Sequence, residues 1–355
     1  MLTNKQHQES GDKSINIQTN KLNIVQGVNY VEARQIALDV FEANFLRLAN
    51  EAAEIANKRA EVFIDKLLVV LMENAPEALE AFNDPDMQYS LFIAQKEYAR
   101  TGNQDHAEML VNILVDRAKE TEWTLKQIVL NEAVSIAPKL TSSQYNLLTI
   151  LFIVKNTVTP EMYSLDQLID DIEFIISLMS SVVEVRGSVL HLQYTGCCTV
   201  EKSKSVIEIF RDNYPGLFHK GFTKQEFYSI FNSTEQGKQL GDEVLVTCLH
   251  NPELWQPNPK MLGPTNNSFI KLITKMKIDG DTILRMQKFL GSHMMTPTEI
   301  SVYLHQTIPE FHHFHNMSFF DKLEKLELTS VGIAIAQANL RRKFDFKFDL
   351  TKWLS

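Results

Sequence analysis

Cysteine is scarce in this sequence, and its placement excludes a disulfide framework. The 355 residues include three cysteines, Cys197, Cys198 and Cys248. An adjacent pair and a single distant residue form neither an even set nor a Cys-x-x-Cys spacing. We therefore predict buried free thiols, as is usual for a protein of a reducing cytoplasm.

Long hydrophobic runs and an excess of positive charge are also missing. The most apolar stretch, Leu147 to Val154, covers eight residues, whereas a helix needs about 20 to cross a bilayer. Residues 1–10 lack the apolar centre of a signal peptide. The formal net charge of -9 disfavours a general binder of nucleic acid, which needs a basic surface. The sequence thus predicts a cytoplasmic protein without a transmembrane segment.

Glycine and proline are absent between Gly27 and Pro76. Because nothing interrupts this stretch, residues 28–75 are predicted to form one long helix. Apolar or small residues recur in it at alternating steps of three and four, the spacing of a coiled-coil seam: Leu38, Phe41, Phe45, Leu48, Ala52 and Ile55. We predict that this seam packs against the same helix of another subunit.

Residues 1–27 are predicted to be a polar tail followed by a repeated strand pattern. Ile15 and Ile17 alternate with polar residues, and Leu22 and Ile24 repeat that alternation seven residues later. Two such short strands cannot bury their apolar side or pair their edges alone. We predict that strands from several copies pair, so that these four residues also belong to an oligomer interface.

The rest of the chain is predicted to be mainly helical. Residues 76–250 read as a helical bundle, in which Asp84 before Pro85 indicates a helix start and Gly102 a stop. β-branched and aromatic residues near 185–199 indicate a short strand or hairpin.

A proline-rich segment between Asn251 and Asn267 marks a predicted boundary. Residues 251–355 beyond it are predicted to be a helical unit with a small winged-helix-like α/β element. The fold class is therefore mainly α, with short N-terminal strands, one long coiled-coil-like helix and a helical bundle body.

The winged-helix prediction comes from the C-terminal residues. A strand pattern enters a helix through Leu328-Thr329-Ser330-Val331-Gly332, and an alternating pattern from Phe344 to Asp349 indicates a closing strand. The neighbouring basic cluster of Arg341, Arg342 and Lys343 is a candidate contact for a phosphate backbone.

Histidines are the most conspicuous candidate metal ligands: His305, His312, His313 and His315. Imidazole is a common zinc ligand, but this group lacks a nearby cysteine or paired carboxylate at ligand spacing. We interpret these histidines as loop residues that neighbouring phenylalanines anchor to the core, and we predict no metal.

The other residues that could support catalysis or ligand binding also have a purely structural interpretation. The adjacent cysteines cannot both point the same way from a strand, and the glycines between 216 and 241 match no phosphate-binding motif. The acidic run Asp166, Asp170, Asp171 and Glu173 is interpreted as the solvated face of a helix whose other face is apolar. We therefore predict no catalytic residue and no cofactor.

Three stretches resemble a known family. They are Ser10-Gly11-Asp12-Lys13-Ser14-Ile15-Asn16-Ile17-Gln18, then Ala33-Arg34-Gln35-Ile36-Ala37-Leu38-Asp39-Val40-Phe41, and the closing Leu328-Thr329-Ser330-Val331-Gly332-Ile333-Ala334-Ile335-Ala336. Together they resemble a family of uncharacterised bacterial proteins with a polar β tract, a long helix and a helical body, and with tails similar to those of abortive-infection proteins of the alpha type. The resemblance implies bacterial cytoplasmic defence against phage and transfers no catalytic residue.

Three hypotheses follow from the sequence. The first is a non-enzymatic homo-oligomeric interaction protein, a sensor or scaffold component of anti-phage defence with a protein partner. The second is a winged-helix nucleic-acid-binding regulator. The third, which rests on chain length alone, is a hydrolase with an unrecognised site.

Overall fold

The computed structural model describes residues 28–44, 50–179, 182, 185–201, 204–232, 234–262, 268–311 and 324–354. The described chain is mainly helical, with four short strands among these residues. Side-chain caps begin many of the helices; reciprocal capping boxes, for example, pair Thr141 with Gln144 and Thr296 with Glu299. No helix of the described residues is both long and apolar enough to span a bilayer.

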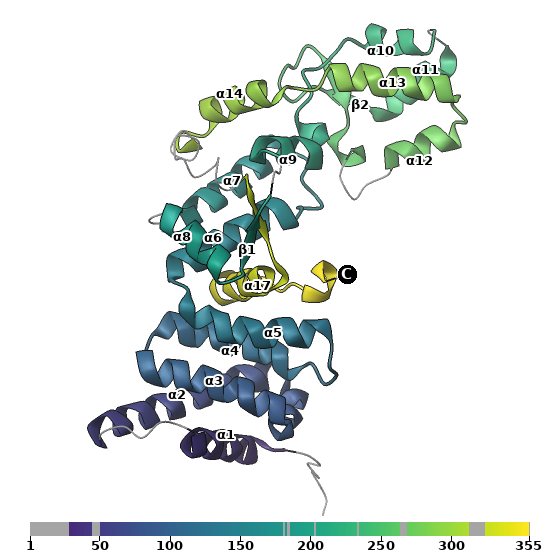
Figure 1. The fold of residues 1–355 in the computed structure, drawn as a ribbon. Helices are drawn as coiled ribbons and strands as arrows, with labels where there is room; N and C mark the ends of the chain where they lie inside the picture. Colours follow the sequence, from purple (N-terminus) through teal and green to yellow (C-terminus); the bar gives the residue numbers. More distant parts are fainter. Residues whose placement is uncertain are drawn as a thin grey trace, which may run out of the picture.

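The predicted single long helix is wrong, because the chain forms two helices here. They are α1 (Tyr30–Asn44) and α2 (Asn50–Asn74), and they lie against each other at one end of the bundle (Figure 1). Arg34 Nε lies 2.7 Å from Asp65 Oδ1, whereas a continuous helix would separate these residues by about 46 Å at ~1.5 Å per residue. Small residues on α1, Ala33 and Ala37, are fully buried and allow this close packing.

The helical body follows in chain order. Its elements are η1 (Pro76–Asn83), α3 (Pro85–Thr101), α4 (Gln104–Ala118), α5 (Leu125–Ile136), η2 (Ala137–Lys139), α6 (Ser142–Leu151), η3 (Phe152–Asn156) and α7 (Leu165–Met179). The predicted limits of α3 are confirmed: the Asp84 side chain caps its start, and Gly102 ends it in the left-handed conformation at φ 64°. The bundle prediction for this part of the chain is thus correct.

Of the short strand or hairpin predicted near 185–199, the structure forms no hairpin and has a strand only at the end of the segment. Val185–Tyr194 forms helix α8, and Cys198–Val200 forms strand β1. The partner of β1 is the distant strand β4 (Leu326–Leu328), with Cys198 opposite Leu328 in an antiparallel pair. The β-branched residues that suggested a hairpin instead sit in a helix, because helix propensity is a weak preference that tertiary packing overrides.

The last long helix, α17 (Ser330–Phe344), lies at the centre of the bundle and packs against α4, α5 and α6 (Figure 1). Every residue from Val331 to Leu340 is buried. A recognition helix has to present a face to DNA, so burial all around α17 does not fit the predicted winged helix. The predicted closing strand is absent as well, since Asp345–Asp349 forms no regular element and η6 (Leu350–Trp353) follows.

A second hydrophobic core forms a distal lobe, defined here as residues 222–292. It contains α10 (Lys224–Ile230), α11 (Glu235–Val244), β2 (Leu245–Thr247), β3 (Trp255–Pro257), η5 (Pro259–Met261), α12 (Ser268–Lys275) and α13 (Gly280–Ser292). Because β2 pairs with β3 across the predicted boundary at residue 251, that boundary does not separate the two cores.

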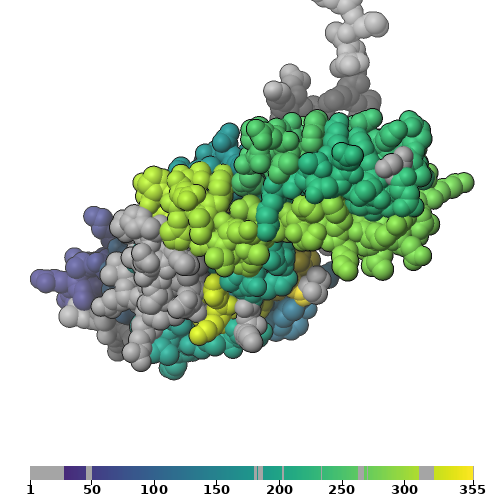
Figure 2. Space-filling model, turned by 90° about the horizontal axis from the view of Figure 1, so that it is seen from above, coloured from purple at the N-terminus to yellow at the C-terminus, as the bar shows by residue number. Residues whose placement is uncertain are grey.

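Backbone hydrogen bonds between residues 218–220 and 293–295 join the distal lobe to the bundle, and we call these two segments the neck. Met295 N donates to Phe218 O, and Lys220 N donates to His293 O. The elements next to this neck are α9 (Val206–Asn213), η4 (Pro215–Leu217) and α14 (Pro297–Thr307). Seen from above, the lobe and α14 lie over one end of the bundle (Figure 2).

Candidate functional site

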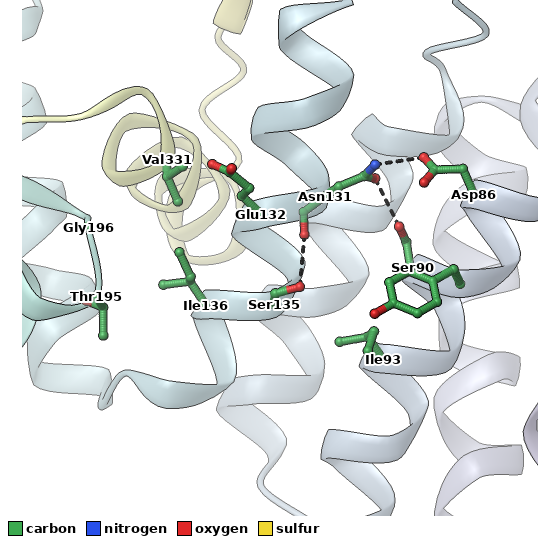
Figure 3. Close-up of a pocket in the computed structure, with 11 residues that line it drawn as sticks. Asp86, Ser90, Ile93, Asn131, Glu132, Ser135, Ile136, Thr195, Gly196 and Val331 are labelled. Atoms are coloured by element: carbon green, nitrogen blue, oxygen red, sulfur yellow. Dashed lines mark hydrogen bonds between the residues drawn. The ribbon is translucent and has the colours of Figure 1, made fainter. Parts of the chain in front are cut away.

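A cleft between α3 and α5 is the candidate ligand site; we call it the α3–α5 cleft. Its volume is about 410 Å³, within the range of small-molecule sites. Helices α3 and α5 supply most of its lining, and the turn between α8 and β1 and the start of α17 close it (Figure 3). The lining residues are Asp86, Tyr89, Ser90, Ile93, Asn131, Glu132, Ser135, Ile136, Thr195, Gly196 and Val331.

One wall of the cleft is a chain of polar side chains. Asn131 Nδ2 donates to Asp86 Oδ2 at 2.7 Å, and Ser90 Oγ donates to Asn131 Oδ1 at 2.9 Å. Ser135 Oγ donates to the carbonyl of Asn131 one helical turn earlier (Figure 3). The hydroxyl donors of Ser90 and Ser135 and one of the two amide N–H donors of Asn131 are therefore used within the wall.

The Arg117 side chain lies behind this wall and has no solvent exposure. Its guanidinium donates to Asn131 Oδ1 at 2.7 Å, to Asp86 Oδ2 at 2.6 Å and to Asp84 Oδ2 at 3.2 Å. Burial acts to raise the pKa of Asp86, but hydrogen bonds from Arg117 and Asn131 outweigh it and hold the pKa below its ordinary value. One guanidinium thus faces two ionised carboxylates.

The opposite side of the cleft is apolar and is fixed by a close backbone contact. Gly196 has φ 73° in the turn before β1, and its carbonyl accepts a hydrogen bond from Thr329 Oγ1 at 2.6 Å. Gly332 lies so close to this turn that an added Cβ would come within 2.0 Å of the Cys197 carbonyl oxygen. These contacts place the start of α17, and with it Val331, at the edge of the cleft.

This site was not predicted from the sequence. The signal available in the sequence was Arg117 at the end of a largely apolar helical stretch, together with the polar residues Asn131 and Ser135 one turn apart in the next helix. A buried arginine needs nearby carboxylates, but the sequence does not show that Asp84 and Asp86 are the ones that reach it.

The predicted coiled-coil seam is only partly described, and its described residues do not form one surface. Phe41 is buried within its own chain against Ala56, Ala60 and Ala99. Leu38 is half-buried, whereas Ala52 and Ile55 are exposed. The remaining predicted interface residues lie outside the described residues: Ile15, Ile17, Leu22, Ile24, Phe45 and Leu48.

Two of the three predicted nucleic-acid contacts, Arg341 and Arg342, are mostly buried in ion pairs, whereas Lys343 is exposed. Arg341 forms a two-pronged ion pair with Asp116, and Arg342 Nη1 lies 2.8 Å from Asp105 Oδ1. Lys343 Nζ donates to Asn146 Oδ1 at 2.9 Å. These contacts join the end of α17 to α4 and α6, so the two arginines are engaged within the protein and Lys343 alone of the predicted cluster is exposed.

Three other sequence interpretations can be compared with the structure. Cys197, Cys198 and Cys248 are buried and free, as predicted, and burial raises the pKa of the Cys198 thiol to about 12. His305 lies in α14, whereas His312, His313 and His315 lie outside the described residues. In the described part of the chain, no three His, Cys, Asp or Glu side chains are grouped to hold a metal ion.

The acidic run on α7 is mostly a solvated face, as predicted. Asp166, Asp170 and Glu173 are exposed, and Leu168, Ile172 and Ile175 are buried on the opposite side. Asp171 differs, since it is half-buried and accepts a hydrogen bond from Thr159 Oγ1 at 2.9 Å. Burial and the neighbouring Asp170 raise the pKa of Asp171.

A second surface feature is an apolar stripe on α2, which we call the outward stripe. It consists of Ile55, Val62, Val69 and Met72, which are 53%, 47%, 51% and 43% exposed. At ~100° per residue, this stripe lies about 180° from the buried face formed by Ala60, Phe63, Ile64, Leu67 and Leu71. Helix α2 thus carries exposed apolar side chains, interspersed with Lys58 and Asp65, on the face opposite its buried one.

Comparisons with known proteins give one match. A protein-family model matches residues 27–354, and its description names no activity, ligand or partner. No curated protein and no solved structure is detectably similar to the chain.

Proposed function

The chain belongs to the family whose model matches residues 27–354, and we propose that it is a non-enzymatic interaction protein that forms homo-oligomers. The observation that supports this proposal is the outward stripe on α2. A surface helix of a single subunit normally has one apolar face and one polar face. The outward stripe on the opposite face of α2 fits burial against another molecule.

A second copy of the chain is the partner that the spacing favours. Val62 is the midpoint between Ile55 and Val69. If two α2 helices pack antiparallel around a two-fold axis at Val62, Ile55 of each copy meets Val69 of the other, which is the self-complementarity that such an interface requires.

The biological setting is proposed from the family resemblance of the sequence. The C-terminal and N-terminal stretches that resemble bacterial abortive-infection-related proteins support a sensor or scaffold role in anti-phage defence, in the bacterial cytoplasm. Neither a winged-helix regulator nor a hydrolase has a comparable supporting observation. A defence role predicts that deleting the gene raises phage plaque counts and that an oligomer-breaking variant fails to restore protection.

The assembly is tested by substituting the stripe. Val62→Asp combined with Val69→Asp puts charges into the proposed contact, where an unpaired buried charge is costly, while both positions are exposed in the single chain. Light scattering after size exclusion should show a multimer for the natural chain and a monomer for the double variant. The matched control is Val31→Asp, at a 72% exposed valine on α1, which should keep the natural mass. A natural chain that is monomeric at tens of micromolar would overturn the proposal.

A further inference from the structure

The polar side chains that line the α3–α5 cleft have more free hydrogen-bond acceptors than free donors. Ser90 and Ser135 already donate their hydroxyl protons within the wall, and Thr195 Oγ1 donates to the carbonyl of His191. The carboxylates of Asp86 and Glu132 are acceptors. Except for the Tyr89 hydroxyl, which can serve either way, and the second amide N–H of Asn131, the polar side chains of the lining therefore offer acceptors to a ligand.

The side chains in and behind the lining of the cleft also carry more negative than positive charge. Arg117 supplies one positive charge behind the wall, and Asp84 and Asp86 supply two negative charges. Glu132 adds a further carboxylate and forms no ion pair among the described residues. Figure 3 shows this carboxylate directed toward Val331, at the start of α17. The lining thus has an excess of negative charge next to an apolar surface.

The apolar part of the lining indicates that the rest of the ligand is apolar. Ile93, Ile136 and Val331 come from three different helices and face the same space (Figure 3). An aliphatic segment could cover these side chains while a charged donor at its end reaches the acceptors.

From this arrangement we infer that the α3–α5 cleft binds an ammonium or guanidinium group carried on an aliphatic stem. Such a group has donors and no acceptor, which matches the acceptors of Asp86, Glu132, Ser90 and Ser135. The group can come from a free amine or from a lysine or arginine side chain of another protein. The inference does not depend on the proposed assembly through α2, because the cleft and the outward stripe lie on different helices.

Binding is tested on the full chain with three probes of equal length: n-hexylammonium, n-hexanol and n-hexanoate. Ligand-observed NMR titration measures the affinity of each probe. The inference requires n-hexylammonium to bind more tightly than both others. Equal binding of hexylammonium and hexanol would show an apolar pocket without charge selection, and tighter binding of hexanoate would show a site for anions; each result would overturn the inference.

A pair of variants separates the cleft from the general negative charge of the protein. Glu132→Gln removes a carboxylate from the lining without touching Arg117, and Glu73→Gln removes one from the exposed end of α2. Glu132→Gln should weaken hexylammonium binding about threefold, and Glu73→Gln should leave it unchanged. Equal effects of the two substitutions would overturn the inference.

Two further probes distinguish the sources of the cation. Spermidine represents a free polyamine, and Nα-acetyl-lysine methylamide represents a lysine side chain in a protein. The probe that shows the larger loss of affinity in Glu132→Gln, relative to Glu73→Gln, identifies the source. If neither probe distinguishes the two variants, the cleft does not take this class of ligand.

Discussion

Arg117 Nη2 lies 2.6 Å from Asp86 Oδ2, and this contact joins a fully buried arginine to the wall of the α3–α5 cleft. The guanidinium also contacts Asp84, Asn131 and the carbonyl of Glu120. It therefore joins the start of α3, the middle of α5 and the end of α4. The same residues that shape the cleft also stabilise this part of the bundle.

Replacing this arginine should destabilise the protein strongly. Arg117→Ala leaves a cavity and two carboxylates without their cation, so we expect the free energy of unfolding to fall by about 3 kcal/mol. Urea denaturation followed by circular dichroism measures the change. Arg100→Ala removes a surface ion pair whose arginine is 63% exposed and should cost less than about 1 kcal/mol. Similar losses for both variants would contradict the role given to Arg117.

Stability should fall in mild acid because of His219 in the neck. This histidine is buried, and burial together with His293 and His250 lowers its pKa to about 4. The unfolded chain, with an ordinary pKa near 6.5, then binds more protons than the folded chain, so the stabilisation is complete above about pH 6.5 and is lost as the pH falls toward 4.

The size of this acid effect gives a direct test. The difference between the two pKa values corresponds to about 3 kcal/mol over the whole range. Denaturation curves at pH 7 and pH 5 should show most of this loss for the natural chain and a smaller loss for His219→Gln. Parallel behaviour of the variant and the natural chain would show that other groups cause the acid sensitivity.

Replacing each of two glycines by alanine should change the stability of the protein in opposite directions. Gly332→Ala puts a Cβ 2.0 Å from the Cys197 carbonyl oxygen, and this overpacking should cost about 2 kcal/mol or more. Gly291→Ala, in α13, meets no atom within 4 Å and should stabilise the chain by about 0.5 kcal/mol through helix propensity. Melting temperatures decide the signs, and a neutral Gly332→Ala would contradict the close approach of α17 to the β1 turn.

Substitutions at Phe41 and at Val62 should affect folding and assembly separately. Phe41 is 1% exposed and packs within its own chain, so Phe41→Ala should lower the free energy of unfolding by about 3 kcal/mol without changing the mass of the assembly. Val62→Asp should lower the mass and leave the unfolding of the single chain nearly unchanged. Loss of assembly in Phe41→Ala at full helix content would instead place Phe41 in the contact between subunits.

Local features of the fold were predictable from the sequence where neighbouring residues decide them. Asp84 before Pro85 predicted the start of α3, and Gly102 predicted its end, because capping involves contacts a few residues apart. The apolar and acidic faces of α7 were predictable for the same reason. The buried state of the cysteines followed from their chemistry.

The sequence by itself therefore determined a mainly helical chain and several helix limits, through composition, periodicity and caps. Only the tertiary structure decided that α1 folds back on α2, that β1 pairs with β4, and that Arg341 and Arg342 bind carboxylates of α4. Each of these relationships joins residues separated by 31 to 237 positions, and the local pattern is the same whether or not they meet. Burial of a charged or apolar side chain is favourable only against a suitable partner, and the partner is chosen by the packing of the whole chain.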